Sequence, residues 1–208
     1  MIFKKKFTLQ YIALLLVYSV LILCAFNIRS ILDFVNTSIM YLPLFFIVTV
    51  SNYNSRINDV GMLEIEYTQN KHKLITYIKD LAYDCLTVMI MTGVHLIICK
   101  LLYTLSFNAA VTIYDYIIHT IISIVFFSSI AYIVCALSFS KSIAIFVCSM
   151  IWIYFMVNID STSLINPFYY VGDPNSSAVH MYGQSMISLV LIIVTGYIRL
   201  QRPFFFKQ

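Results

Sequence analysis

The stretch that decides the fold runs from residue 114 to residue 159 and reads YDYIIHTIISIVFFSSIAYIVCALSFSKSIAIFVCSMIWIYFMVNI. Asp115 and Lys141 are its only Asp, Glu, Lys or Arg residues, and a short break, Ser138 to Lys141, separates its two apolar halves. A helix that crosses the hydrocarbon core of a bilayer needs about 20 apolar residues. The stretch therefore predicts two membrane-spanning helices joined as a tight antiparallel hairpin.

The composition of the whole chain agrees with this interpretation. Of its 208 residues, 61% are hydrophobic and 11% are charged, and the mean hydropathy is +0.89. A soluble domain carries about 25% charged residues. The chain lacks the polar side chains that would coat a globule in water, so we expect lipid to be the solvent for most of its surface.

Six apolar stretches meet or approach the length of a membrane span, and they predict an all-α polytopic protein with a single transmembrane domain over residues 1–208. The second stretch contains Pro43, and the sixth is short. The first follows Lys4 to Lys6 and has no small-residue cleavage site after it, so we interpret it as an uncleaved helix rather than a signal peptide. The stretches are Phe7 to Ile28, Phe34 to Ser51, Leu81 to Leu102, Tyr114 to Phe139, Ser142 to Ile159 and Met186 to Leu200.

The positions of the basic residues predict the orientation of these spans. With the N-terminus inside, only Arg29 and Lys100 of the 13 Lys and Arg residues lie on the outer side. An excess of positive charge marks the cytoplasmic side, so we expect a multi-pass protein of the cell membrane with both termini in the cytoplasm. Because the charges lie between apolar runs, they do not indicate nucleic-acid binding. The inner basic residues are Lys4, Lys5, Lys6, Arg56, Lys71, Lys73, Lys79, Lys141, Arg199, Arg202 and Lys207.

Two connections are longer than a tight turn. The inner one, Asn52 to Asp80, ends in an amphipathic pattern that predicts a helix along the membrane surface between spans two and three. The outer one, Asp160 to Ser185, is rich in turn residues and predicts a loop. Aromatic rings in that loop are expected in the headgroup layer, where an amphipathic ring meets both solvents. These rings are Phe168, Tyr169 and Tyr170.

The inner connection carries a resemblance to a known family. Residues 64–79 read EIEYTQNKHKLITYIK, in which acidic residues precede a basic turn and then a helix that ends in Lys79. Together with six spans and a basic start, this pattern resembles the permease subunit of ABC-2 type ATP-binding cassette transporters. The resemblance covers the whole chain in layout and about twenty residues in pattern. The alternative interpretation is an interfacial helix with a purely structural role, which anchors the hairpin.

The resemblance implies that this segment is a coupling helix seated in a cytoplasmic ATPase. Glu64 and Glu66 would contact the ATPase, and Lys71 and Lys73 would contact it or the lipid headgroups. The chain has no GxxxxGK[ST] phosphate loop, so ATP would be bound by a separate subunit and the chain itself would need no cofactor. A second permease chain, identical or homologous, would complete the pathway. The small outer connection favours a peptide or amphipathic substrate. The permease would export this substrate or confer immunity to it, as in bacteriocin immunity.

Three ionisable residues inside the predicted spans are candidates for a substrate path, because charge in lipid is costly. His95 is the deepest of them, and a neutral imidazole hydrogen-bonded to a neighbouring helix is the alternative to a functional role. Asp115 and His119 are four residues apart and so share a helix face. That pair is suited to metal binding or proton transfer, or else to a simple interfacial hydrogen bond.

Other classes of protein remain as alternatives to the permease. A substrate-binding membrane subunit of a vitamin importer has a similar length and number of spans. An intramembrane enzyme would use His95 or the pair formed by Asp115 and His119, but motifs such as HExxH and GxSG are absent, so we expect no enzyme. A membrane partner that does not transport is a further alternative. The five cysteines lie in apolar stretches without metal-binding spacing and are expected to be small buried hydrophobes.

Overall fold

The computed structural model describes residues 9–26, 28–57, 73–103, 107, 111–160, 163–172 and 177–205. In this part of the chain the regular structure is helical: six long helices and one short one. The helices are α2 (Leu9–Ala25), α3 (Ile31–Ile57), α5 (Lys73–Leu102), α6 (Ile113–Ser138), α7 (Lys141–Val157), α8 (Tyr169–Gly172) and α9 (Ser177–Phe205). The predicted all-α fold is confirmed for these residues.

Polar side chains set the ends of the central helices. Helix α6 starts with a capping box, in which the Thr112 hydroxyl accepts from the Asp115 amide and the Asp115 carboxylate accepts from the Thr112 amide. It ends at Phe139, whose left-handed backbone (φ 56°) lets its amide donate to the Cys135 carbonyl. Ser140 then caps α7, so a two-residue link joins the two helices. The predicted tight hairpin is therefore present.

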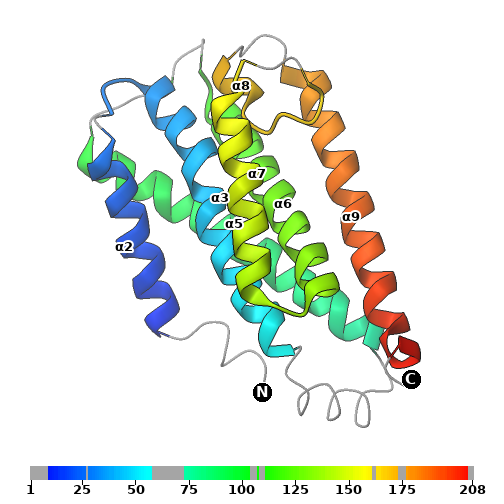
Figure 1. Cartoon of the computed structure of the whole chain (residues 1–208). Coiled ribbons are helices and arrows are strands. Elements are labelled where there is room, and N and C mark those ends of the chain that lie inside the picture. Colours follow the sequence, from blue (N-terminus) through cyan, green and yellow to red (C-terminus); the bar gives the residue numbers. More distant parts are fainter. Residues whose placement is uncertain are drawn as a thin grey trace.

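Helices α3 and α6 form the centre of the bundle (Figure 1). They pack against each other and against α7, while α2 covers the free side of α3 and α9 covers the free side of α6. Helix α5 crosses behind the bundle and contacts α2, α6 and α9 (Figure 1). The buried residues of α6 include small ones such as Ser123, Ser129 and Ala131, which let neighbouring helices approach closely.

Four of the six predicted spans are long and apolar enough to cross a membrane in the described residues: Ile31–Asn52, Tyr77–Leu102, Ile113–Ser138 and Val179–Leu200. The other two, α2 and α7, have 17 residues each. Such a helix is about 26 Å long, slightly less than a hydrocarbon core of about 30 Å. The structure therefore supports four spans by length, and it includes two shorter apolar helices at the positions expected for the first and the fifth.

The second predicted span, Phe34 to Ser51, lies within α3, which continues through Pro43 to Ile57. The expectation for the sixth span was partly wrong. The sixth helix has 29 residues and starts at Ser177, inside the segment predicted to be a loop. The polar residues at its start do not face water: Gln184 is 1% exposed and His180 is 8% exposed. Because both bond to the preceding loop, their polarity does not end the helix.

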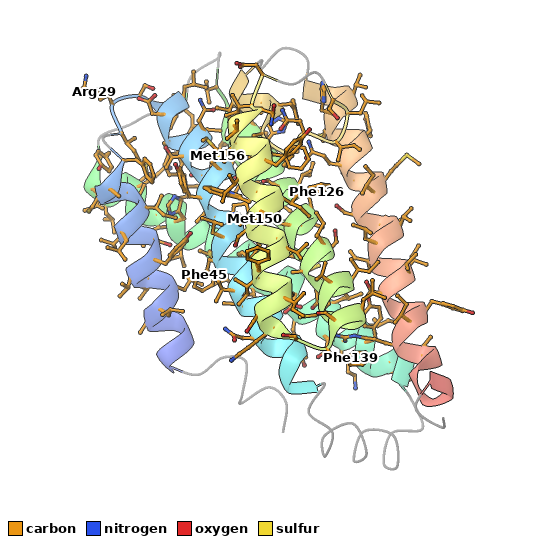
Figure 2. All side chains as sticks on the ribbon, viewed as in Figure 1. Arg29, Phe45, Phe126, Phe139, Met150 and Met156 are labelled. Atoms are coloured by element: carbon orange, nitrogen blue, oxygen red, sulfur yellow. The ribbon has the colours of Figure 1, made fainter. Side chains whose placement is uncertain are left out.

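The two ends of the bundle differ in the connections they carry. Helix α2 starts, and α9 ends, at the end where α6 turns into α7 (Figure 1). Arg29, between α2 and α3, lies at the opposite end from Phe139 (Figure 2). This arrangement is the one that six passes with both termini on one side require. After the orientation expected from the sequence, we call the end with Phe139 the inner end and the end with Arg29 the outer end.

Candidate functional site

The predicted coupling segment lies largely outside the described residues. Glu64, Glu66 and Lys71 belong to the range 58–72, and Lys73 is the first residue of α5. The second half of the amphipathic pattern, residues 74–79, forms the first turns of α5. That half is therefore continuous with the third span in one helix.

The start of α5 is fastened to α9 and α6 by a group that we call the inner clamp, namely Tyr77, Tyr132 and Arg199. The Tyr77 hydroxyl donates to the Ile192 carbonyl of α9 at 2.7 Å. The Arg199 guanidinium carbon lies 5.4 Å from the centroid of the Tyr77 ring and 5.6 Å from that of Tyr132. Cations within about 6 Å of a ring face are attracted by its electrons, so Arg199 joins α9 to both other helices.

The glycine at position 196 makes this approach possible. A Cβ atom built there would lie 2.8 Å from Cε1 of Tyr77, closer than such atoms are normally found. Since the Tyr77 hydroxyl is held at Ile192, the ring has little freedom to move aside. Gly196 therefore allows α5 and α9 to touch at the inner end. The other end of α5 is fastened as well, because the Tyr103 hydroxyl donates to the Leu23 carbonyl of α2 at 2.7 Å.

At the outer end, four aromatic side chains form an outer cluster: His119, Tyr169, Tyr170 and His180. His119 Nδ1 shares a hydrogen bond of 2.7 Å with the Tyr169 hydroxyl, and its ring stacks on Tyr170 at 4.3 Å between centroids. Tyr169 in turn stacks on His180 at 4.6 Å. The cluster joins α6, α8 and α9. Burial raises the pKa of the Tyr169 and Tyr170 phenols above its usual range.

The loop before α8 closes the outer end of the bundle. Asn166 is 0% exposed; its side-chain amide donates to the Ile159 carbonyl at 2.8 Å, and its own carbonyl accepts from Gln184 Nε2 at 2.6 Å. The aromatic run that follows was expected to meet the headgroup layer, but its three side chains are buried within the protein. Phe168 is 0% exposed and packs against Phe127 of α6. A buried loop needs partners for its polar groups, and Asn166 provides them.

Asp115 and His119 hydrogen-bond to other residues rather than to each other. The Asp115 carboxylate accepts from the Thr112 amide at 2.8 Å and from the Thr112 hydroxyl at 2.7 Å, so it caps α6. His119 bonds to Tyr169 instead. Within the residues that the structure describes, no group of three or more His, Cys, Asp or Glu side chains is arranged to hold a metal ion. The geometry supports the structural interpretation of both residues.

His95 lies in the interior, in a different setting from the one expected. It is 0% exposed, and neither ring nitrogen has a hydrogen-bond partner among the described residues. Its ring stacks on Phe34 of α3, with centroids 5.4 Å apart, and Tyr116 of α6 stacks on Phe34 at 4.9 Å. The Tyr116 hydroxyl donates to the Thr92 carbonyl rather than to the imidazole. The expected hydrogen bond to a neighbouring helix is therefore missing, and His95 is the candidate that helix packing explains least.

An apolar groove lies between α6 and α9. It has a cavity volume of about 170 Å³ and is lined by Ile121, Ile122 and Val125 from α6 and by Ser185, Leu189 and Ile192 from α9. Its walls offer carbon atoms almost throughout, so its chemistry suits a hydrocarbon chain or an apolar side chain rather than a charged group. None of its residues was selected from the sequence, because isolated Ile, Leu and Ser residues in a span carry no pattern.

No protein-family model matches the chain, and no curated protein or solved structure matches it either. The described residues define a class: an all-helical protein with four helices long and apolar enough to cross a membrane. The inner clamp and the outer cluster, which fasten its peripheral helices, were not predicted. Their members stand far apart in the sequence, and only their contacts identify them.

Proposed function

We propose that this chain is the membrane-spanning permease subunit of an ATP-binding cassette transporter. It crosses the cell membrane six times with both termini in the cytoplasm, and a separate ATPase subunit drives it. The range 58–72 with Glu64, Glu66 and Lys71, followed by Lys73, docks on that ATPase. A second permease chain completes the pathway.

The observation that carries this proposal is the way α5 is attached. The docking segment leads directly into α5, whose first turns are fixed to α9 through Tyr77. The last turn of α5 leads to Tyr103, which is fixed to α2. A rigid helix bound at both ends transmits a displacement from one to the other. Movement of the docking segment therefore reaches α9 directly and α2 at the outer end of the bundle.

The apolar groove between α6 and α9 supports the proposed substrate class. The groove adjoins the helix that Tyr77 holds, and Ile192 belongs to both features. A displacement of α5 would pull on the wall of the groove. An amphipathic peptide, with an apolar face for the groove and a polar face for water, is the substrate that fits both properties. Export of such a peptide, or immunity to it, is the activity we propose.

The test is purification of the tagged chain from its native membrane in mild detergent, followed by identification of its partners and their ATPase activity. The variant is the double substitution Glu64→Ala and Glu66→Ala. Lys141→Ala is the matched control, because it removes an exposed charge at the other inner connection. We expect an ATPase subunit with the wild-type chain and the control, and its loss from the double variant. Recovery of no ATPase with any of the three chains would refute the proposal.

A further inference from the structure

Three side chains that carry sulfur or nitrogen ligand atoms share one buried face of α5. They are Met91, His95 and Cys99, and their exposed fractions are 0%, 0% and 2% in that order. Residues four apart on a helix lie one above the other, with Cβ atoms about 5–6 Å apart. A thioether, an imidazole and a thiol therefore follow one another inside the bundle. We call these three residues the α5 triad.

The imidazole at the middle of the α5 triad has two free ligand atoms. Neither Nδ1 nor Nε2 of His95 has a hydrogen-bond partner among the described residues. One face of the ring is covered by Phe34, with centroids 5.4 Å apart and planes inclined by 16°. The nitrogens lie on the edge of the ring, so this stack leaves them pointing past Phe34 and not at it. A buried polar group without a partner costs free energy, and a bound ion is one of the ordinary explanations for it.

The thiol of Cys99 lies beside the same aromatic stack. Tyr116 stacks on Phe34 at 4.9 Å between centroids, and Cys99 lies close enough to Tyr116 for the thiol and the phenol to interact electrostatically. The Tyr116 hydroxyl donates to the Thr92 carbonyl at 2.8 Å, so it does not occupy the imidazole. Both aromatic side chains are 0% exposed. They cover the α5 triad and leave its nitrogen and sulfur atoms for another ligand.

We infer that the α5 triad binds one Cu(I) ion. Thiolate and thioether sulfurs are the soft ligands that select Cu(I), and imidazole also suits copper. The spacing is favourable as well, because two ligand side chains four residues apart on one helix face hold a single metal ion in motifs such as HExxH. His95 and Cys99 have this spacing, and Met91 extends it by one turn in the other direction.

Charge balance favours Cu(I) over a divalent ion. When copper binds, an Sγ–Cu bond replaces the Sγ–H bond of Cys99, and the proton leaves to water. The thiolate carries one negative charge and Cu(I) one positive charge, so the loaded site is neutral and the copper keeps its oxidation state. Zn²⁺ on the same ligands would leave a net positive charge in an apolar interior, and it would lack the fourth ligand that structural zinc sites have.

The sequence drew attention to other residues. Cys99 was expected to be a small buried hydrophobe, and metal binding was considered for Asp115 and His119, which the structure gives other partners. Two members of the α5 triad were not selected, because a buried Met or Cys in a span is ordinary until its neighbour is known. The site is independent of the proposed function, since none of its residues docks on an ATPase or lines the apolar groove.

The test measures the Cu(I) affinity of the full chain in nanodiscs, without oxygen, by competition with a coloured Cu(I) chelator. The exposed cysteines, Cys24 and Cys85, are replaced by serine in every chain, so that only buried thiols remain. We expect one Cu(I) per chain. Loss of a mere partner of a metal ligand costs about 10–100-fold in affinity, so His95→Leu and Cys99→Ser should each weaken binding by at least about 100-fold. Cys148→Ser is the matched control, because it removes another buried thiol, and it should leave the affinity unchanged.

X-ray absorption at the copper edge identifies the ligands. We expect an imidazole nitrogen together with sulfur in the wild-type chain, no imidazole signal in His95→Leu, and a weaker sulfur signal in Met91→Leu. Thermal unfolding without metal checks that the variants fold, and His95→Leu should not be less stable because it removes only nitrogens without partners. Absence of stoichiometric binding, equal weakening by Cys99→Ser and Cys148→Ser, or equally tight Zn²⁺ binding at these residues would each overturn the inference.

Discussion

The hydrogen bond from Ser123 to the Ile39 carbonyl should matter only because residue 43 is a proline, which has no N–H group to donate to that carbonyl. We predict that Ser123→Ala destabilises the chain with Pro43 in place and has little effect in a Pro43→Ala background. In the second background the amide of residue 43 can donate to the same carbonyl, so the carbonyl keeps a partner. The two substitutions therefore form a double-mutant cycle in which the coupling is the measured quantity.

The magnitude follows from the geometry of the bond. The donor and acceptor are 3.0 Å apart and the serine is fully buried, so the bond is well formed and out of contact with lipid headgroups. Hydrogen bonds between membrane helices stabilise by about 0.6 kcal/mol on average and up to about 1.7 kcal/mol. A buried acceptor left without its donor adds to that loss. We expect Ser123→Ala to cost about 1–2 kcal/mol beside Pro43, with a coupling energy of about 1 kcal/mol.

The assay is reversible unfolding of the purified chain in mixed micelles, with the four chains of the cycle measured under one condition. Ser129→Ala is the matched control, because the Ser129 hydroxyl donates at 2.7 Å to the Phe126 carbonyl of its own helix. Its effect should be the same in both backgrounds. If Ser123→Ala costs equally with Pro43 and with alanine at position 43, the reasoning about the freed carbonyl is refuted.

Three further outcomes follow from buried contacts. His95→Leu should raise the free energy of unfolding by about 1 kcal/mol, because it removes two ring nitrogens without partners; a lower stability would show that His95 has a partner. Gly196→Ala should cost about 1–3 kcal/mol, since its Cβ would meet the Tyr77 ring, whereas Gly93→Ala, with open space around it, should not destabilise. Tyr169→Phe should lower the thermal midpoint and speed proteolysis of the outer loop, as it removes a buried hydrogen bond; unchanged cleavage would contradict this.

Apolar length was sufficient to predict most of the helices. The start and end of α6 and α7 lie within two residues of the predicted bounds. An apolar run that spans lipid must form a helix unless it belongs to a closed barrel, so its length predicts the helix bounds. The start of α9 was predicted nine residues late, at Met186 instead of Ser177. Its first turns contain polar residues, and hydropathy cannot distinguish polar side chains that face water from those that bond inside the protein.

The candidate residues divide in the same way. His95, Asp115 and His119 were chosen because an ionisable side chain is costly inside lipid. All three have specific settings in the interior or at a helix cap. Their roles were not readable, because a partner such as Tyr169 stands 50 residues from His119 and carries no signal of the pairing. The same holds for the inner clamp.

The sequence by itself determined that this is a helical protein whose helices favour lipid, where most of them lie along the chain, and which end carries the positive charge. These properties depend on length and composition, which act locally. Only the tertiary structure decided that α3 and α6 are central, that Arg199 joins α9 to the start of α5, and that Ser123 completes the backbone at Pro43. Those contacts join residues far apart in the chain, and their energies depend on distances of a few ångströms that only folding fixes.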